Sequence, residues 1–347
     1  MNRMRAFLRS AGAAALVLCL CLPGTAWSAG RRNLEIYFVD VEGGQATLMV
    51  TPAGQSLLID TGWPGYEGRD AARIAAAAQA AGLRQIDFVL ITHDHRDHVG
   101  GAPQLAARMK IGAFVDHGPN QEDTDDVRPF YAAYEQLLAH ARHIVVRPGD
   151  RLPLKGVSVQ VLAAAGAHIS AALPGAGQPN PLCSSEPQPP LDPTENARSL
   201  GTLLTYGNFR FLDLGDLTKQ KELELACPAN LVGTVDVYLT THHGLDQSNA
   251  RALVHALHPR VAIMNNGARK GGSPPAWQIV HDSPGLEDMW QLHYAVAGGA
   301  EHNVAEKLIA NPEENCQGQY LKVVAQDDGS FTVSNSRNQY SRNYAKR

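Results

Sequence analysis

The sequence predicts an α/β fold with mixed sheets, and two patterns carry this prediction. Residues 34–62 alternate short β-rich runs with turns built on glycine and proline, which is typical of three antiparallel strands. Further along, an alanine-rich helical stretch ends at Gly82 and is followed by an apolar run at 86–91 that reads as a buried strand. With 347 residues and 44% hydrophobic content, the chain is long enough for one large core or two modest ones.

Residues 1–29 have the composition of a secretory signal peptide. Arg3, Arg5 and Arg9 precede the apolar run AGAAALVLCLCL, and GTAWSAG offers small residues for cleavage. We therefore expect an exported protein, periplasmic or secreted; a short membrane anchor is the alternative. Losing the three arginines changes the formal net charge from −4 to −7, and such an acidic chain is unsuited to coating long nucleic acid.

Three cysteines, Cys183, Cys227 and Cys316, lie beyond this segment. In an oxidising compartment three thiols allow one disulfide and leave one thiol over. The spacing does not decide which pair forms. We expect a structural role for the bond.

Four side chains able to bind metal follow the strand at 86–91. His93, His95, Asp97 and His98 fall within six positions of THDHRDHVGG. Where the backbone is extended, His93 and His95 project to the same side and can share one ion. Asp97 and His98 follow as the chain turns toward a helix, so they suit a second ion. Imidazole nitrogen with carboxylate oxygen favours zinc, with manganese or iron as alternatives.

Two later strands are predicted to end in residues of the same chemistry. The hairpin SLGTLLTYGNFRFLDLGD places Asp216 at the end of its second strand, where a helix N-cap is the alternative role. The strand in VDVYLTTHHG ends at Thr241 and presents His242 and His243. We favour His243 as a metal ligand and His242 as a supporting group or proton carrier. A shift of one residue in register would exchange the two.

From about Leu34 to Ile263, these motifs resemble the metallo-β-lactamase superfamily and, within it, the ComEC-like branch. The resemblance rests on YFVDVEGGQATLMV, SLLIDTG, the H-x-H-x-D-H motif, NARSLGTLLTYGNFRFLDLGDL and VDVYLTTHHG. It implies an αββα sandwich of two mixed β-sheets flanked by helices, formed by residues 30–334. It also implies that Asp216 bridges two metal ions and that Asp60 orients a histidine ligand. For Asp60, capping a turn is the alternative.

Five further residues are candidates for the site: His117, Asn196, Ser199, Arg269 and Lys270. In many members of the superfamily a separate histidine completes the first metal site, and the familiar motif for it is not found here. His117, at the end of the predicted strand in IGAFVDHG, is the candidate, and a histidine lining the cleft is the alternative. Asn196 and Ser199 are candidates for substrate contact. Arg269 and Lys270 in GARKGG could hold an anionic group, or form a solvated basic turn.

Three segments are expected to depart from this pattern. Residues 165–195 hold seven prolines and no periodicity, so they form either a lid that shapes a pocket, which we favour, or a disordered insertion. Residues 277–296 are interpreted as helical pieces. A terminal hairpin follows, and residues 335–347 are expected to form a frayed polar tail.

The expected activity is metal-dependent hydrolysis. Two zinc ions would generate a hydroxide nucleophile near neutral pH, with Asp97 orienting it. The resemblance favours phosphodiester or phosphate-ester substrates that are small or short and anionic. The acidic loop at 122–126 and the lack of an interleaved aromatic and basic strip argue against long nucleic acid. A lactone or β-lactam hydrolase and a non-catalytic metal-binding scaffold are the alternatives.

Overall fold

The structure is a computed structural model, and it describes residue 1 and residues 33–347. The signal peptide predicted for residues 1–29 lies, apart from Met1, outside the described residues. Within residues 33–347 we find no helix with the length and apolar character that a membrane span needs.

Two mixed β-sheets form the centre of the domain. In the described part of the chain the first sheet has nine strands, in the order β17-β16-β15-β1-β2-β3-β4-β5-β6, and the second has eight, in the order β14-β13-β12-β11-β10-β9-β7-β8. The first sheet consists of β1 (Leu34–Phe38), β2 (Thr47–Val50), β3 (Ser56–Ile59), β4 (Gln85–Leu90), β5 (Lys110–Asp116), β6 (His143–Val145), β15 (Leu321–Ala325), β16 (Phe331–Asn335) and β17 (Ser341–Tyr344). The second consists of β7 (Ser158–Ala164), β8 (Ala167–His168), β9 (Gly201–Tyr206), β10 (Phe209–Asp213), β11 (Val237–Leu239), β12 (Val261–Met264), β13 (Asp288–His293) and β14 (Ile309–Asn311).

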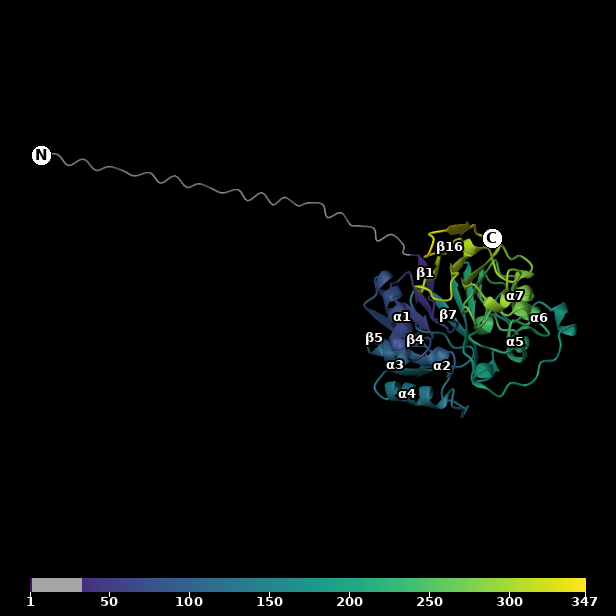
Figure 1. Ribbon diagram of the computed structural model, residues 1–347, viewed down its shortest axis with the longest axis horizontal. Coiled ribbons are helices and arrows are strands. Elements are labelled where there is room, and N and C mark those ends of the chain that lie inside the picture. Colours follow the sequence, from purple (N-terminus) through teal and green to yellow (C-terminus); the bar gives the residue numbers. More distant parts are fainter. Residues whose placement is uncertain (2–32) are drawn as a thin grey trace. The chain divides into compact units, whose positions relative to one another are not determined.

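Helices cover the outer face of each sheet, as Figure 1 shows. The first sheet is covered by α1 (Arg69–Ala80), α2 (Arg96–Val99), α3 (Ala102–Ala106) and α4 (Arg128–Leu138), and the second by α5 (Lys219–Ala226), α6 (Arg251–Leu257) and α7 (Pro274–His281). Short 3-10 helices are η1 (Tyr66–Gly68), η2 (Pro181–Ser184), η3 (Glu195–Arg198), η4 (Thr241–Gly244), η5 (Val296–Gly298) and η6 (Glu306–Leu308). The predicted αββα sandwich is confirmed.

The largest core lies between the two sheets. Along β1, Ile36 and Phe38 face this core, whereas Tyr37 between them faces the helical layer. Successive side chains of a strand point to opposite faces, so the consecutive apolar residues 36–38 show that β1 is covered on both sides. Phe38 meets Phe211 of β10 edge to face, with ring centroids 5.7 Å apart. The two sheets are therefore joined directly by interlocking side chains.

Parallel strands set the position of the polar residues. Strands β3, β4 and β5 pair in parallel, and so do β10, β11, β12 and β13. The carboxyl ends of parallel strands open at the same edge of a sheet, where ligands usually bind. The loops after β4, β10, β11 and β12 carry, in order, the H-x-H-x-D-H motif, Asp216, the pair His242–His243 and Lys270.

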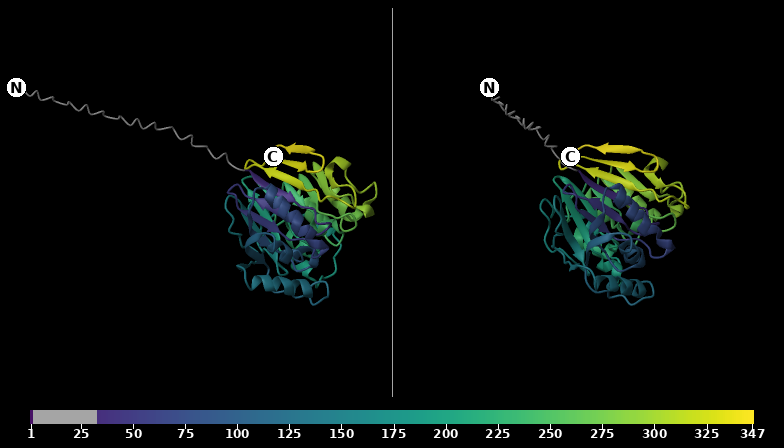
Figure 2. Two further views of the ribbon diagram at one scale, coloured as in Figure 1. Left: turned by 60° about the vertical axis from the view of Figure 1, so that its left-hand side comes forward. Right: turned by 90° about the vertical axis from the view of Figure 1, so that its left-hand side faces the viewer.

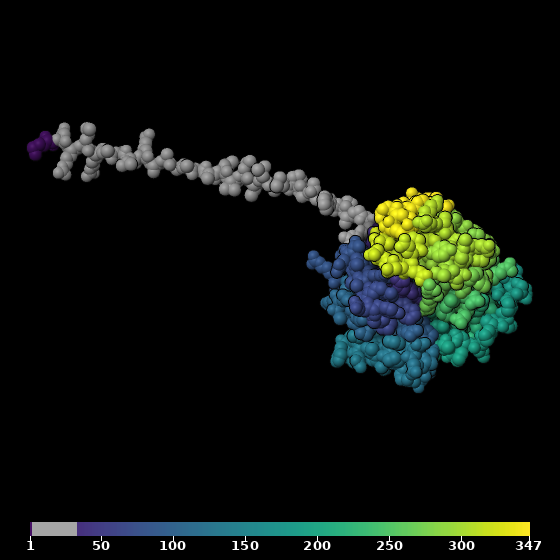
Figure 3. All heavy atoms as spheres, viewed as in Figure 1, coloured from purple at the N-terminus to yellow at the C-terminus, as the bar shows by residue number. Residues whose placement is uncertain are grey.

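Two predictions near the carboxyl end of the chain are wrong. Residues 288–293 form β13, a strand whose residues after Asp288 are all buried, rather than a helical piece. Residues 341–344 do not fray, because β17 pairs antiparallel with β16. Tyr344 is buried, and its ring stacks on Phe331 at 4.7 Å. The yellow terminal strands lie side by side in Figure 2 and at the surface in Figure 3.

Cys183 and Cys227 form the disulfide, and Cys316 keeps a free thiol. The bond ties the proline-rich segment 165–195 to the end of α5, across a sequence separation of 44 residues. Such a link reduces the conformational freedom of the unfolded chain.

Replacing both Cys183 and Cys227 with alanine is therefore expected to lower the free energy of unfolding by about 2–4 kcal/mol. A urea titration of the wild type and the double variant measures this difference. The variant Cys316→Ala is the control, because that thiol closes no loop. Equal midpoints for the wild type and the double variant would contradict the prediction.

Candidate metal centre

Four buried side chains surround one point where the two sheets meet. Ligand atoms of Asp97, His98, Asp216 and His243 all lie within 4.8 Å of one another. His243 Nε2 lies 3.3 Å from Asp97 Oδ2 and 3.3 Å from Asp216 Oδ2. His98 Nε2 lies 3.2 Å from the same two oxygens. Two carboxylates and two imidazoles from three loops therefore point at a shared space.

His93 and His95 lie on another side of the Asp216 carboxylate. His93 Nε2 is 3.9 Å from Asp216 Oδ2 and 3.0 Å from His95 Nδ1. The remaining nitrogen of His95, Nε2, lies 3.2 Å from Glu122 Oε2. The structure thus groups five predicted ligands around the carboxylate of a sixth, Asp216. We call them the Asp216 cluster: His93, His95, Asp97, His98, Asp216 and His243.

The contacts of His98 show where positive charge is favoured in the Asp216 cluster. Its Nδ1 lies 2.7 Å from Asp60 Oδ2, and its Nε2 lies 3.2 Å from both Asp97 Oδ2 and Asp216 Oδ2 and 3.3 Å from His243 Nε2. Burial lowers the pKa of His98, but Asp216, Asp97 and Asp60 outweigh burial and raise that pKa well above its usual value. A metal ion bound at this point would supply positive charge in place of the proton.

Electrostatics at the Asp216 cluster also favour a cation. Burial raises the pKa of Asp216, but His243, His98 and His242 outweigh burial and hold that pKa well below its usual range. Burial, together with His98 and His95, lowers the pKa of His93 well below its ordinary value. Metal ligation needs ionised carboxylates and neutral imidazoles, and these two groups are in those states at neutral pH.

Asp60 is placed to orient His98, as the resemblance implies. It is fully buried just after β3, with a backbone φ of 61°, which is uncommon for a residue other than glycine. Thr92 holds the carboxylate, since its amide donates to Oδ1 and its hydroxyl to Oδ2, both at 2.7 Å. Thr92 therefore fixes the Asp60 carboxylate independently of its contact with the His98 ring.

Replacing Asp60 with alanine is expected to weaken metal binding by about 10–100-fold, the usual cost of removing a group that orients a metal ligand. The imidazole of His98 would lose its fixed tautomer and orientation. Competition with a chromophoric chelator measures the affinity. Replacing Thr92 with valine is the milder comparison, since the Thr92 amide still holds Asp60. An unchanged affinity in Asp60→Ala would count against this role.

The histidine pair follows β11 in an unusual backbone conformation. His242 and His243 both have φ of 55°, in the left-handed region, where residues other than glycine are often found at functional sites. Both rings consequently reach Asp216, since His242 Nε2 lies 3.4 Å from Asp216 Oδ2. The sequence did not show which histidine faces Asp216. Side chains alternate between two faces only in an extended strand, and the backbone of this turn is not extended.

The structure does not bring His117 into the Asp216 cluster. Its Nε2 lies 3.0 Å from Glu195 Oε2, in a separate buried group with Asp94. The imidazole that we expected to complete the first metal site therefore lies beside the carboxylate of Glu195 in η3, outside the Asp216 cluster. Ser199 is also buried, and its hydroxyl accepts a hydrogen bond from the Asp216 amide at 3.2 Å. Ser199 thus supports the loop that carries Asp216.

The two basic candidates in GARKGG, Arg269 and Lys270, point in different directions. Lys270 Nζ contacts Asp97 Oδ2 in the Asp216 cluster, and the neighbouring loops approach closely, since a Cβ on Gly271 would lie 2.2 Å from the His243 carbonyl oxygen. Arg269 points outward, with 73% of its side chain exposed, and pairs with Glu314 at 2.8 Å. Only the lysine of this pair faces the cluster.

Comparison with known proteins places this geometry in a family. The profile of the metallo-beta-lactamase superfamily matches residues 39–176. Over these residues the chain belongs to the metallo-β-lactamase superfamily. It is 26% identical over 190 residues to ComE operon protein 3 of Bacillus subtilis, covering 54% of this chain and 21% of that protein. It is 33% identical over 135 residues to a hydroxyacylglutathione hydrolase of Acidiphilium cryptum, covering 39% of this chain and 46% of that protein.

A solved structure is also similar to this chain. The metallo-beta-lactamase fold protein YhfI of Bacillus subtilis shares 11% identity, with a TM-score of 0.44, 75% of this chain covered and 95% of that one. The chain spans less than half of the length of each of the two curated relatives, 21% and 46%. Homologues in the superfamily are metal-dependent hydrolases.

The mouth of the site is a cavity of about 530 Å³ beside the Asp216 cluster. Lys270 Nζ lies 4.9 Å from the ring centroid of Trp63, and the Arg96 guanidinium lies 5.2 Å from it. The acidic loop at 122–126 lies on the rim of this cavity, to which it contributes Glu122, Thr124, Asp125 and Asp126. Neither Trp63 nor Arg96 was anticipated, because their sequence neighbourhood carries no signal beyond the adjacent motif.

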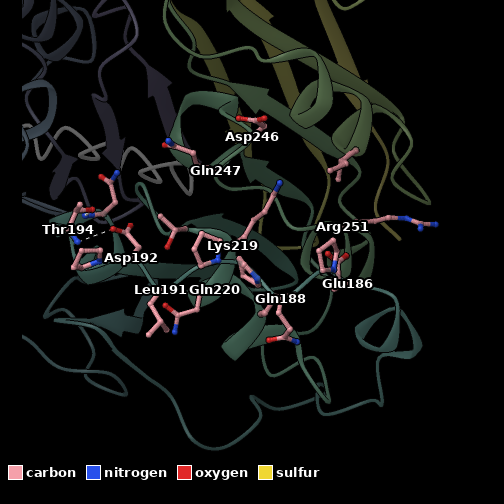
Figure 4. Close-up of a pocket in the computed structure, with 18 of the residues that line it drawn as sticks. Glu186, Gln188, Leu191, Asp192, Thr194, Lys219, Gln220, Asp246, Gln247 and Arg251 are labelled. Carbon is pink, nitrogen blue, oxygen red and sulfur yellow. Dashed lines mark hydrogen bonds between the residues drawn. The ribbon is translucent and has the colours of Figure 1, made fainter.

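A second cavity, of about 860 Å³, is bordered by the proline-rich segment. Figure 4 shows side chains of that segment facing Lys219 and Gln220 at the start of α5, and Thr194 donating its amide to Asp192 Oδ1 at 2.9 Å. Asn196 and Thr218 also line it, and Thr218 comes two residues after Asp216. The expectation that this segment shapes a pocket is confirmed.

Proposed function

We propose that this chain is a metal-dependent hydrolase that uses two zinc ions to cleave phosphate esters or phosphodiesters of small or short anionic substrates. The observation that carries the proposal is the position of Lys270. Its ammonium group contacts Asp97 of the Asp216 cluster and also lines the mouth cavity. A positive charge there favours a substrate whose anionic group lies next to the metal ligands.

When bound, two divalent cations would supply Lewis acidity and lower the pKa of a water molecule to about 7. The residues of the chain would orient the attacking water and transfer protons. Burial raises the pKa of Asp97, but Lys270, His98 and His243 outweigh it, so the carboxylate stays ionised and can accept a proton or orient the attacking water. This is the role expected for Asp97.

His242 is the proposed proton carrier, and geometry rather than its pKa supports this role. Burial lowers its pKa to about 4, so the imidazole is neutral at neutral pH. Its Nδ1 lies 3.2 Å from the Ser248 hydroxyl and its Nε2 faces Asp216. A neutral imidazole held at both nitrogens can receive a proton at one of them and release it at the other.

Charges at the mouth support a small substrate rather than a long nucleic acid. Glu122, Asp125 and Asp126 lie on the same cavity as Lys270 and Arg96. Arg96 is already paired with Asp126 at 3.2 Å. Carboxylates repel a continuous phosphate backbone, whereas one anionic group can approach Lys270 alone.

Replacing Lys270 with methionine is expected to lower kcat/KM on bis-p-nitrophenyl phosphate by about 10–100-fold, the cost of a charge-assisted contact. The loss should be smaller on the neutral ester p-nitrophenyl butyrate. Arg269→Met is the matched control, because that side chain points outward to Glu314, and it should keep wild-type kinetics. Equal losses on both substrates in Lys270→Met would contradict an anion-binding role.

A second candidate function is hydrolysis of a carboxylic acyl bond, such as that of a lactone or a β-lactam. Similarity to hydroxyacylglutathione hydrolases favours it. A screen of metal-loaded protein against bis-p-nitrophenyl phosphate, a lactone and a cephalosporin separates the candidates. Turnover of the phosphodiester alone supports the proposal, turnover of the lactone or cephalosporin alone favours the second candidate, and metal uptake without turnover favours a binding scaffold.

Export is part of the proposal. The Cys183–Cys227 disulfide is a bond typical of oxidising compartments, and the composition of residues 1–29 points the same way. Fractionation of cells that express the full chain tests it. The mature protein should be found in the periplasm or medium, and recovery in the cytoplasm with reduced cysteines would count against export.

A further inference from the structure

A second group of metal-binding side chains lies apart from the Asp216 cluster. Asp94, His117 and Glu195 offer ligand atoms within 4.8 Å of one another. Their exposed fractions are 3%, 5% and 0%. They come from three different places: the loop after β4, the end of β5, and η3 where the proline-rich segment returns to the core. We call them the Asp94 triad.

The polar atoms of the Asp94 triad do not satisfy one another. Among residues 33–347, Asp94 Oδ2, Glu195 Oε2 and both nitrogens of His117 lack a hydrogen-bond partner. His117 Nε2 and Glu195 Oε2 are only 3.0 Å apart, yet they are not aligned as donor and acceptor. Buried polar atoms are nearly always paired, so four unpaired atoms in one place require an explanation.

The charged groups next to the Asp94 triad do not supply the missing hydrogen bonds. Glu195 Oε1, the second oxygen of that carboxylate, accepts the Gln121 amide at 2.9 Å and lies 3.1 Å from Arg198 Nε. Asp116, which also faces Asp94, is already held by Tyr134 and His143 at 2.9 and 2.7 Å. The oxygens directed into the triad therefore remain without a hydrogen-bond partner, and the triad itself consists of two carboxyl groups and one imidazole.

We propose that the Asp94 triad binds a third divalent cation, distinct from the two at the Asp216 cluster, with a structural role. One imidazole nitrogen with two carboxylate oxygens suits zinc or manganese, whereas calcium prefers oxygen ligands throughout. Short contacts that are not aligned as hydrogen bonds are what ligands around a common ion show.

Such a cation would hold three loops beside the mouth of the site. Asp94 lies between His93 and His95, and Glu195 follows the proline-rich segment directly. The Glu195 amide also donates to Glu122 Oε2 at 2.8 Å, the same oxygen that lies 3.2 Å from His95 Nε2. The ion would thus fix the return of the segment relative to the first metal ligands without contacting substrate.

Metal analysis of zinc-loaded protein tests the proposal. After removal of free zinc, the wild type should hold about three equivalents, whereas Glu195→Gln and His117→Gln should hold about two. Asp116→Asn is the matched control, because it removes a neighbouring buried carboxylate that is not in the triad, and it should keep about three. Zinc should also raise the Tm of Asp116→Asn more than that of Glu195→Gln.

Anomalous diffraction from wild-type crystals soaked in zinc gives an answer even if the variants do not fold. A peak between Asp94, His117 and Glu195 is expected, in addition to density at Asp216. Equal zinc content in all four proteins, or a map with peaks at Asp216 and none at the triad, overturns the proposal while leaving the Asp216 cluster intact. Peaks at the triad without any at Asp216 would support it and contradict the proposed catalytic centre instead.

Discussion

Replacing Asp216 with asparagine is expected to reduce kcat/KM by at least about 10³-fold, the upper range for loss of one group that stabilises developing charge. The cost is large because one oxygen serves both halves of the site. Asp216 Oδ2 lies 3.2 Å from His98, 3.3 Å from His243 and 3.9 Å from His93. The amide of asparagine cannot supply the negative charge that two cations would share. Steady-state kinetics and metal analysis of the same preparation measure both losses.

Asp213→Asn is the matched control for this experiment. Asp213 is a buried aspartate at the end of the same strand, but its carboxylate accepts hydrogen bonds from Gln45 Nε2 at 2.9 Å and from the Gly215 amide at 3.0 Å. Burial raises its pKa to about 7, so asparagine replaces a group that is already partly neutral. This variant should keep its metal. A wild-type metal content and rate in Asp216→Asn would remove the basis for a bridging carboxylate.

Replacing Phe211 with alanine is expected to lower the free energy of unfolding by about 3–5 kcal/mol. Phe211 is 1% exposed in the middle of β10 and packs against Phe38 of the other sheet. Truncation removes apolar contact and leaves a cavity that the two sheets close only in part. Strand β10 also leads directly to Asp216, so its destabilisation would affect the loop that holds this metal ligand.

Denaturant unfolding of Phe211→Ala measures this cost. Thr205→Ala is the control, since Thr205 is a partly exposed residue on the neighbouring strand β9, and changes at such positions usually stay within about 0.5 kcal/mol. A difference of less than about 1 kcal/mol for Phe211→Ala would show that the two sheets do not depend on this contact.

The strands around the site were predictable because their signals are local. The apolar run predicted at 86–91 is β4, and the hairpin across Gly207 and Asn208 is β9 and β10. Strand β13 was missed because buried strands lack the alternation that distinguishes them from helical segments. Strand β17 was missed because only Tyr344 of SRNY is buried, so an edge strand looks like a solvated tail.

The side chains that meet across loops were harder to predict. The H-x-H-x-D-H motif and Asp216 end strands, so their convergence follows from parallel pairing. His117 also follows a strand, but it lies beside Glu195, outside the Asp216 cluster. Glu195 is 78 positions further along the chain. Trp63 reaches the mouth from a loop without periodicity. Contacts of this kind depend on tertiary packing, which no local pattern encodes.

The proposed hydrolase requires that two metal ions share the Asp216 carboxylate. Anomalous diffraction at the zinc absorption edge, from crystals of the zinc-loaded full chain, locates these ions. We expect two peaks about 3.5–4 Å apart, one beside His93 and His95 and the other beside Asp97, His98 and His243, with Asp216 contacting both. A single peak at this site, or none within coordination distance of Asp216, would contradict it.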